Sequence, residues 1–139
     1  MLFRSIPTAR RCFKLGQAIR RAVEAYPKDL RVAIFGTGGL SHQLSGERYG
    51  YNNNEWDHQF LQLIEKDPER VARMTHQELM EMGGADGVEM IMWLVMRGAL
   101  SNDIACRHRN YYHPMVTGFG QIILEEPNDG LGRLAQAAE

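Results

Sequence analysis

Two residues of this 139-residue sequence have types and settings that suggest chemistry. The first is Glu89, in GADGVEMIMWLVMRGAL (residues 84–100), a segment otherwise predicted to be one apolar helix. Met92, Trp93 and Met96 share its helical face, and a carboxylate buried there without a partner would cost several kcal/mol. We therefore expect Glu89 to be protonated, paired or bound to a metal. The alternative is a place near the helix start, where the helix dipole favours a carboxylate that points to solvent.

The second residue is His42, in GTGGLSHQL. Gly36, Gly38 and Gly39 follow RVAIF, residues 31–35, an apolar and β-branched run predicted to be a buried strand. A position beyond the carboxyl end of a strand is where α/β proteins place catalytic groups, although most loop histidines are structural hydrogen-bonding residues. Since the loop has neither GxGxxG nor GxxxxGK[ST], phosphate binding is the weaker interpretation.

Other chemical motifs are missing from the sequence. Ser41 adjoins His42, but neighbours in sequence point apart and there is no GxSxG elbow, so we predict no serine–histidine triad. The methionines of the Glu89 helix indicate core packing rather than a cofactor site. The remaining histidines lack the HxxxH or HxH spacing of a self-contained metal site: His58, His76, His108 and His113. These residues alone do not name a reaction.

Short strands and helices must position these groups. Thr75 and Glu78 have the spacing of a capping box. In chain order we predict an amphipathic helix over 9–25, the strand 31–35, a helix over 54–65, a short helix from Thr75 to Gly83–Gly84, the Glu89 helix and a strand over 121–125. This order predicts the α/β class, with short strands and packed helices. We expect one domain over residues 1–126 and a flexible tail over 127–139.

Composition limits the location and the partners. With 44% hydrophobic and 24% charged residues the chain is typical of a soluble globular protein. A net charge of -1 gives no electrostatic case for binding nucleic acid or an acidic membrane. The apolar run 88–96 is too short to span a bilayer. Only two cysteines, Cys12 and Cys106, favour a cytoplasmic location, and the basic MLFRSIPTARR leaves a mitochondrial presequence as the alternative.

The motif GTGGLSHQLSGERYGYNNNEWDHQFL, followed along the chain by GADGVEMIMWLVMRGAL, resembles the class III extradiol ring-cleavage dioxygenases. The resemblance is strongest to the catalytic (beta) subunit of protocatechuate 4,5-dioxygenase and its gallate-cleaving relatives. It runs from RRCFKLGQAIRRAVEAYP to GQIILE, with both motifs in the same order, and so covers most of the chain. It implies the fold of the C-terminal half of that subunit. It also implies cleavage of a catechol-type aromatic ring with O2.

The resemblance also implies roles for five residues. The family holds a non-haem Fe(II) with two histidines and one glutamate, and the glutamate corresponds to Glu89. His42 corresponds to the acid-base residue, which takes a proton from the substrate hydroxyl. Substrate contacts are implied for Gly39, Ser41 and Thr117. A metal cation would explain how an apolar helix tolerates Glu89.

Two departures from the family pattern change the expectation. The family's histidine ligands precede the GTGG segment, and no histidine of this chain matches them. We therefore expect a chain that is inactive alone, with an Fe(II) site completed by an N-terminal half, a small subunit or another copy in a homo-oligomer. In PMVTGFG, Met115, Val116 and Thr117 replace an alanine-serine-asparagine run of the protocatechuate enzymes, so a catechol with another substituent fits as well.

Two alternatives to a dioxygenase half remain. A metal-free remnant or interaction module predicts that Glu89→Ala changes stability alone. A nucleotide or phosphate binder would use the loop 36–39, with an incomplete motif. Whichever holds, a half-sheet is expected to expose an edge strand and the apolar sides of the helix 9–25 and of the Glu89 helix, which favours a partner.

Overall fold

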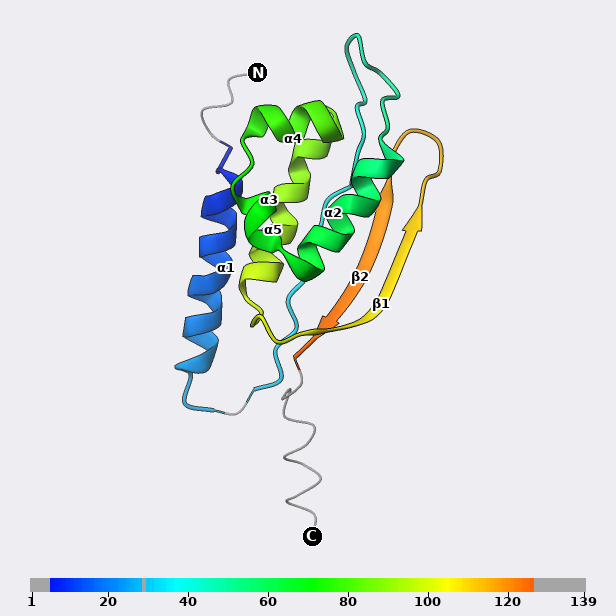
Figure 1. Ribbon diagram of the computed structural model, residues 1–139. Coiled ribbons are helices and arrows are strands. Elements are labelled where there is room, and N and C mark those ends of the chain that lie inside the picture. Colours follow the sequence, from blue (N-terminus) through cyan, green and yellow to red (C-terminus); the bar gives the residue numbers. More distant parts are fainter. Residues whose placement is uncertain (1–5, 29, 127–139) are drawn as a thin grey trace.

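The computed structural model describes residues 6–28 and 30–126, in which helices pack on one side of a two-stranded antiparallel sheet. Figure 1 shows α1 beside α5, with α2 between α5 and the sheet. The elements are, in chain order, α1 (Ala9–Glu24), α2 (Asn54–Lys66), α3 (Pro68–Ala72), α4 (His76–Gly83), the 3-10 turn η2 (Gly87–Met90), α5 (Ile91–Gly98), β1 (Ala105–Tyr112) and β2 (Phe119–Glu125). None of the helices in these ranges combines the length and apolarity needed to cross a membrane.

The predicted helices are present, and local side chains define their starts. Thr8 caps α1 by accepting a hydrogen bond from the backbone N–H of Arg11. Helix α2 covers the predicted range 54–65 and one further residue. The capping box ahead of α4 is formed in full, because Thr75 accepts from the N–H of Glu78 and donates its own N–H to the Glu78 carboxylate.

Helices α1 and α5 touch backbone to backbone. A Cβ atom on Gly16 would lie 2.2 Å from the carbonyl oxygen of Val95, and one on Gly98 would lie 2.2 Å from that of Phe13. Any side chain at these glycines would separate the helices. The close contact anchors a core to which α2 contributes Trp56, Phe60, Leu61 and Ile64, and α5 contributes Ile91, Trp93 and Leu94.

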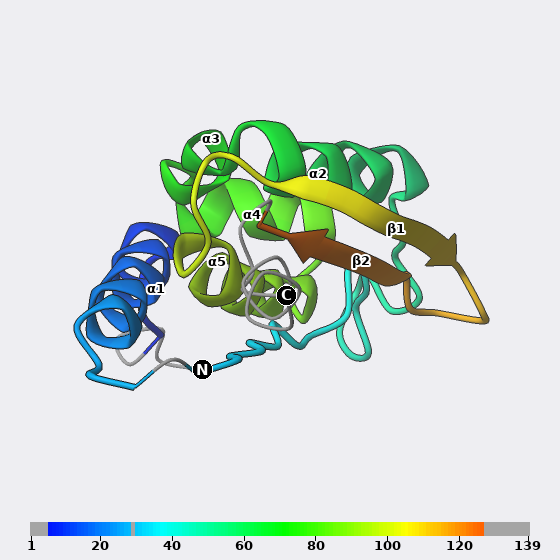
Figure 2. The same ribbon diagram turned by 90° about the horizontal axis from the view of Figure 1, so that it is seen from below.

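The predicted strand over 31–35 is wrong, since these residues form no regular strand. They belong to an extended stretch, residues 30–38, which we call the 30–38 segment. Figure 2 shows it on the opposite side of α5 from α2 and α3. Among the described residues no hydrogen bond engages the backbone of residues 30–37. Leu30, Val32 and Phe35 are exposed, Phe35 to 85%. The run has the composition of a strand, but no neighbouring strand pairs with it in the described ranges.

The C-terminal strands differ partly from prediction. Strand β2 confirms the predicted strand 121–125 and begins two residues earlier. Strand β1 was not predicted, and it pairs with β2 from Ala105 opposite Glu125 to Tyr112 opposite Phe119. The short helix α3 was also not predicted. Residues 127–139 lie outside the described residues, so the flexible tail and the domain boundary stay predictions.

Candidate active site

Four of the five predicted site residues face one another where the 30–38 segment ends. His42 and Thr117 pair as an isolated antiparallel bridge. The backbone N–H of Gly39 donates a 2.6 Å hydrogen bond to Oε1 of Glu89. A Cβ atom on Gly39 would lie 3.0 Å from Cγ2 of Thr117 and 3.1 Å from Cε1 of His42, so this glycine leaves room between the two side chains. Folding thus brings three distant parts of the sequence to one place.

Glu89 does not lie in the middle of a helix. The chain forms the 3-10 turn η2 over Gly87–Met90 before α5 begins, and this turn directs the carboxylate away from the core. The side chain of Glu89 is 49% exposed, so the premise of a buried carboxylate is wrong and the position near the helix start is the observed one. Among the described residues hydrogen bonds reach its Oε1 alone, which leaves Oε2 open to a ligand.

His42 is buried, with 6% of its surface exposed, and its ring orientation is set by the backbone. Its Nδ1 lies 2.9 Å from the carbonyl oxygen of Leu40. Since a carbonyl only accepts, Nδ1 carries the proton of the neutral ring and Nε2 presents its lone pair. Nε2 lies 3.7 Å from Oε1 of Glu89, too far for a direct hydrogen bond. The pair can accept a proton from a hydroxyl placed beside them.

Ser41, the fifth predicted residue, points into the protein. Its hydroxyl donates a 2.8 Å hydrogen bond to Oδ2 of Asp57 and accepts from the N–H of Asn53 at 2.7 Å and from Nδ2 of Asn52 at 3.0 Å. The side chain is fully buried. A substrate contact by Ser41 stays a prediction without an accessible polar atom to support it, because the hydroxyl's hydrogen-bonding capacity is already used internally.

Asp57 and Tyr111 were missed by the sequence prediction. Asp57 is buried on α2 and accepts from the hydroxyl of Tyr111 at 2.8 Å. Burial and this hydrogen bond raise the pKa of Tyr111, so its phenol stays protonated and acts as a donor. The available signal was the position of Asp57, which shares the apolar face of its helix with Phe60 and Leu61. It is the same oddity that pointed to Glu89.

The sequence profile of the family described as "Catalytic LigB subunit of aromatic ring-opening dioxygenase" matches residues 1–123. The chain belongs to this family. It is also 55% identical over 126 residues to a gallate dioxygenase of Pseudomonas putida, in an alignment that covers 91% of this chain and 37% of that protein. The predicted kinship with extradiol dioxygenases is confirmed, as is the class of fold. The chain spans little more than a third of the length of this curated relative.

An iron site of the kind that the resemblance implies is not complete in the described residues. In the ranges 6–28 and 30–126 no three histidine, cysteine, aspartate or glutamate side chains converge to hold a metal ion. A site of two histidines and one carboxylate requires three such groups. Glu89, with one carboxylate oxygen open, fits the carboxylate position. The residues present therefore fit one ligand of such a site.

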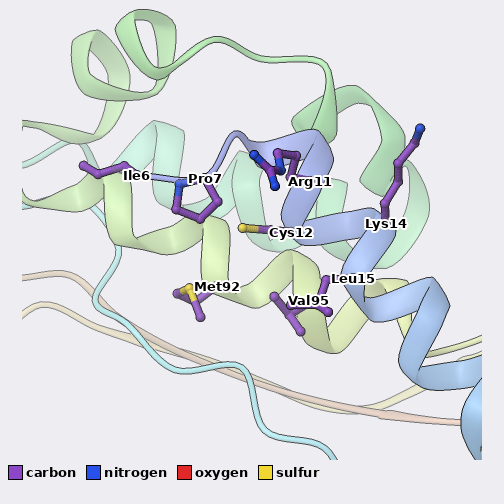
Figure 3. A pocket seen from close by; sticks show the side chains of 8 residues that line it. All are labelled: Ile6, Pro7, Arg11, Cys12, Lys14, Leu15, Met92 and Val95. Carbon is purple, nitrogen blue, oxygen red and sulfur yellow. The ribbon is translucent and has the colours of Figure 1, made fainter. Parts of the chain in front are cut away.

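A separate hollow lies between the start of α1 and α5, and Figure 3 shows its lining. Its walls include Cys12, Leu15, Met92 and Val95. Burial raises the pKa of the Cys12 thiol, so the group is protonated and a poor nucleophile. Leu15 and Met92 are exposed apolar side chains. The hollow is lined mainly by apolar side chains together with Arg11 and Lys14, and its one thiol is a poor nucleophile.

Proposed function

We propose that this chain supplies one part of the active site of an extradiol dioxygenase, which cleaves a gallate- or protocatechuate-like aromatic diol with O2. The observation that carries the proposal is the convergence of Glu89 and His42 in a LigB-family chain 55% identical to a gallate dioxygenase. Glu89 is one ligand of a non-haem Fe(II), and His42 is the acid-base residue. The proposed location is the cytoplasm, because Cys12 and Cys106 are free thiols.

The side chains of this chain have separate tasks in the proposal. A bound Fe(II) would supply a place where the diol and O2 meet. His42 accepts the proton of a substrate hydroxyl at Nε2, since Nδ1 is already bonded to a carbonyl. Gly39 leaves the space that the ring enters, because a side chain there would contact both His42 and Thr117. Thr117 is the polar side chain of the run 115–117 and is the proposed contact to the ring substituent.

The exposed 30–38 segment supports a partner. An edge with unpaired backbone groups and apolar side chains is a template for another strand. Leu15 and Met92 add exposed apolar surface on α1 and α5. The proposed partner is a polypeptide with the rest of a LigB-family catalytic unit, including two histidine ligands. It is favoured over another copy of this chain, whose histidines match neither family ligand.

The test is reconstitution with a matched pair of variants. The chain would be co-expressed with the part of the Pseudomonas putida gallate dioxygenase that lies outside the match, and purified without oxygen. We expect the complex to bind Fe(II) and to consume O2 with gallate, protocatechuate or catechol. Glu89→Gln keeps an acceptor for the Gly39 N–H but removes the charge, so the Fe(II) affinity should fall by about 100-fold or more.

The control for this experiment is Glu47→Gln, which changes an exposed glutamate of the loop between His42 and α2. It should leave Fe(II) binding and O2 uptake unchanged. Equal Fe(II) content in the Glu89→Gln and Glu47→Gln complexes would contradict the role of Glu89. O2 uptake by the isolated chain would contradict the need for a partner.

A metal-free interaction module is the second candidate, favoured by the incomplete ligand set in the described residues. It predicts a tight complex without Fe(II), in which Glu89→Gln changes nothing but stability. The phosphate-binding alternative is disfavoured by a specific contact. The N–H of Gly39, which a phosphate would require, already bonds the carboxylate of Glu89, whose negative charge would repel the anion.

A further inference from the structure

Asp57 is a fully buried carboxylate behind the candidate site, with 0% of its surface exposed, and the proposed reaction does not use it. Three donors reach its oxygens. The backbone N–H of Ser41 bonds Oδ1 at 2.7 Å, and the hydroxyls of Ser41 and Tyr111 each bond Oδ2 at 2.8 Å. A buried carboxylate is unfavourable without such partners. Two of the three donors belong to the residue that precedes His42.

The backbone around Ser41 is attached on each side. The N–H of Leu40 donates to the carbonyl of Gly118 at 2.8 Å, and the N–H of Gly118 donates to the carbonyl of Ser41 at 3.1 Å. The N–H of His42 donates to the carbonyl of Gly83 at 2.8 Å. These bonds fix residues 40–42 to Gly118, the residue before β2, and to Gly83 at the end of α4. Asn52 and Asn53 donate to the carbonyl and hydroxyl of Ser41, and Asp57 accepts from the N–H and the hydroxyl of Ser41.

The ring of His42 depends on this loop for its direction. Its Nδ1–H donates to the carbonyl of Leu40, in the same three-residue stretch that Asp57 holds. If Ser41 lost its bonds to Asp57, the Leu40 carbonyl could rotate and the ring would lose its acceptor. The neutral ring would then exchange between its two tautomers, and Nε2 would no longer be fixed as the proton acceptor.

Asp57 also supports the opposite wall of the site. A Cβ atom on Gly118 would lie 2.2 Å from Oδ2 of Asp57 and 3.1 Å from the hydroxyl oxygen of Tyr111. The chain thus passes directly over the carboxylate at the residue after Thr117. One buried group therefore supports both His42 and Thr117.

We propose that Asp57 is a positioning residue, which acts through Ser41 to hold His42 in its Nδ1–H tautomer with Nε2 directed at Glu89. The inference rests on the proposed role of His42, but the arrangement can be measured without iron, substrate or partner. Asp57→Asn preserves the shape of the side chain. It replaces one acceptor oxygen with an NH2 group, which cannot accept from Ser41 or Tyr111.

The experiment is 15N NMR of the full chain with labelled histidine, at a pH about two units above the ordinary histidine pKa. In the wild type we expect His42 to show a protonated Nδ1 and an unprotonated Nε2. In Asp57→Asn both His42 nitrogens should move toward a common, averaged position. The signals of the other histidines should stay in place. Unchanged His42 signals in a folded Asp57→Asn chain would overturn the proposal.

Val71→Ala separates positioning from mere stabilisation. Val71 is buried in α3, outside the Asp57 hydrogen bonds, so its truncation should lower stability and leave the His42 signals unchanged. A shift of those signals in Val71→Ala equal to that in Asp57→Asn would overturn the proposal as well.

Ser41→Ala keeps the proposal testable if Asp57→Asn does not fold. It removes the hydroxyl bond to Asp57 and keeps the bond of the Ser41 N–H, so averaging of the His42 signals in the same direction, but smaller, is expected. His42 signals like those of the wild type in Ser41→Ala would then overturn the proposal. Failure of the proposed function would show instead as absent Fe(II) in the reconstituted complex, a separate measurement on a different sample.

Discussion

The loop of residues 40–42 and the 30–38 segment are neighbours in sequence, yet they are held in opposite ways. In the loop, Leu40, Ser41 and His42 are buried, and their backbone groups bond Gly118, just before β2, and residues of α4 and η2. In the segment, Leu30, Val32 and Phe35 face outward, and among the described residues no hydrogen bond engages the backbone of residues 30–37. The loop of residues 40–42 is thus held by bonds within this chain, whereas the segment has the composition of a strand and pairs with no strand in the described ranges.

The largest expected effect concerns the packed core, where helices α1 and α5 are in close contact. Gly98→Ala would place a Cβ atom 2.2 Å from the carbonyl oxygen of Phe13 and force α1 away from α5. We expect the free energy of unfolding to fall by about 3 kcal/mol. Urea unfolding followed by circular dichroism measures this change.

Arg10→Ala is the control for Gly98→Ala, since Arg10 is an exposed residue of α1. It should change the free energy of unfolding by about 0.5 kcal/mol or less. A Gly98→Ala chain as stable as Arg10→Ala would show that the core tolerates separation of α1 and α5. It would contradict the importance of this close contact for stability.

The next effect concerns the exposed 30–38 segment. Phe35→Asp should leave the isolated chain folded, because the side chain is 85% exposed, and should weaken the complex with the complementary LigB-family part by about tenfold or more. The dissociation constant by calorimetry is the measurement. Met115→Asp is the matched control, since Met115 is 90% exposed between β1 and β2, and it should leave the affinity unchanged. Equal weakening by both variants would argue against the 30–38 segment as the contact.

The smallest effect concerns the hydrogen bonds behind the loop. Tyr111→Phe removes one donor to Asp57 and should lower the free energy of unfolding by about 1 kcal/mol. Because the pKa of Tyr111 is raised by folding, the folded chain holds the phenol proton more tightly than the unfolded chain does. This contribution to stability is complete below about pH 10 and is lost as the pH rises through the raised pKa.

Unfolding measured from about pH 9 to 11 tests the pH dependence. The wild type should lose stability over this range more steeply than Tyr111→Phe. The control is Tyr112→Phe, which changes the exposed neighbouring tyrosine and should keep the slope of the wild type. A slope in Tyr111→Phe as steep as in the wild type would show that Tyr111 does not titrate as the geometry implies.

The sequence predicted those elements whose signals are local. The helix over residues 9–25 has apolar residues at helical spacing, and the helix after Thr75 has both members of a capping box, so neither depends on distant contacts. The strand over 31–35 failed because composition cannot supply a neighbouring strand. Strand β1 was missed because its sequence, ACRHRNYY, has no apolar alternation, and most of its residues are exposed.

The site was predicted from family resemblance more than from physical chemistry. The structure brings Glu89, His42, Gly39 and Thr117 together, although their roles stay proposals. The argument applied to Glu89 could also have identified Asp57, because both are carboxylates among apolar residues of a predicted helix. What the sequence could not show is which of the two is buried. Glu89 lies in the 3-10 turn η2 and its side chain is exposed. Asp57 is buried, and the hydroxyls of Ser41 and Tyr111 donate hydrogen bonds to it.

The exposed 30–38 segment also has a consequence for the newly made chain, before a partner has bound to it. LRVAIF, residues 30–35, combines β-branched and aromatic residues with one charge and no proline, which is the composition of segments that start aggregation. A newly made chain that presents this edge is exposed to self-association and to proteolysis until something covers it. This segment, which pairs with no strand in the described ranges, would then make the cellular level of the protein depend on the supply of a partner.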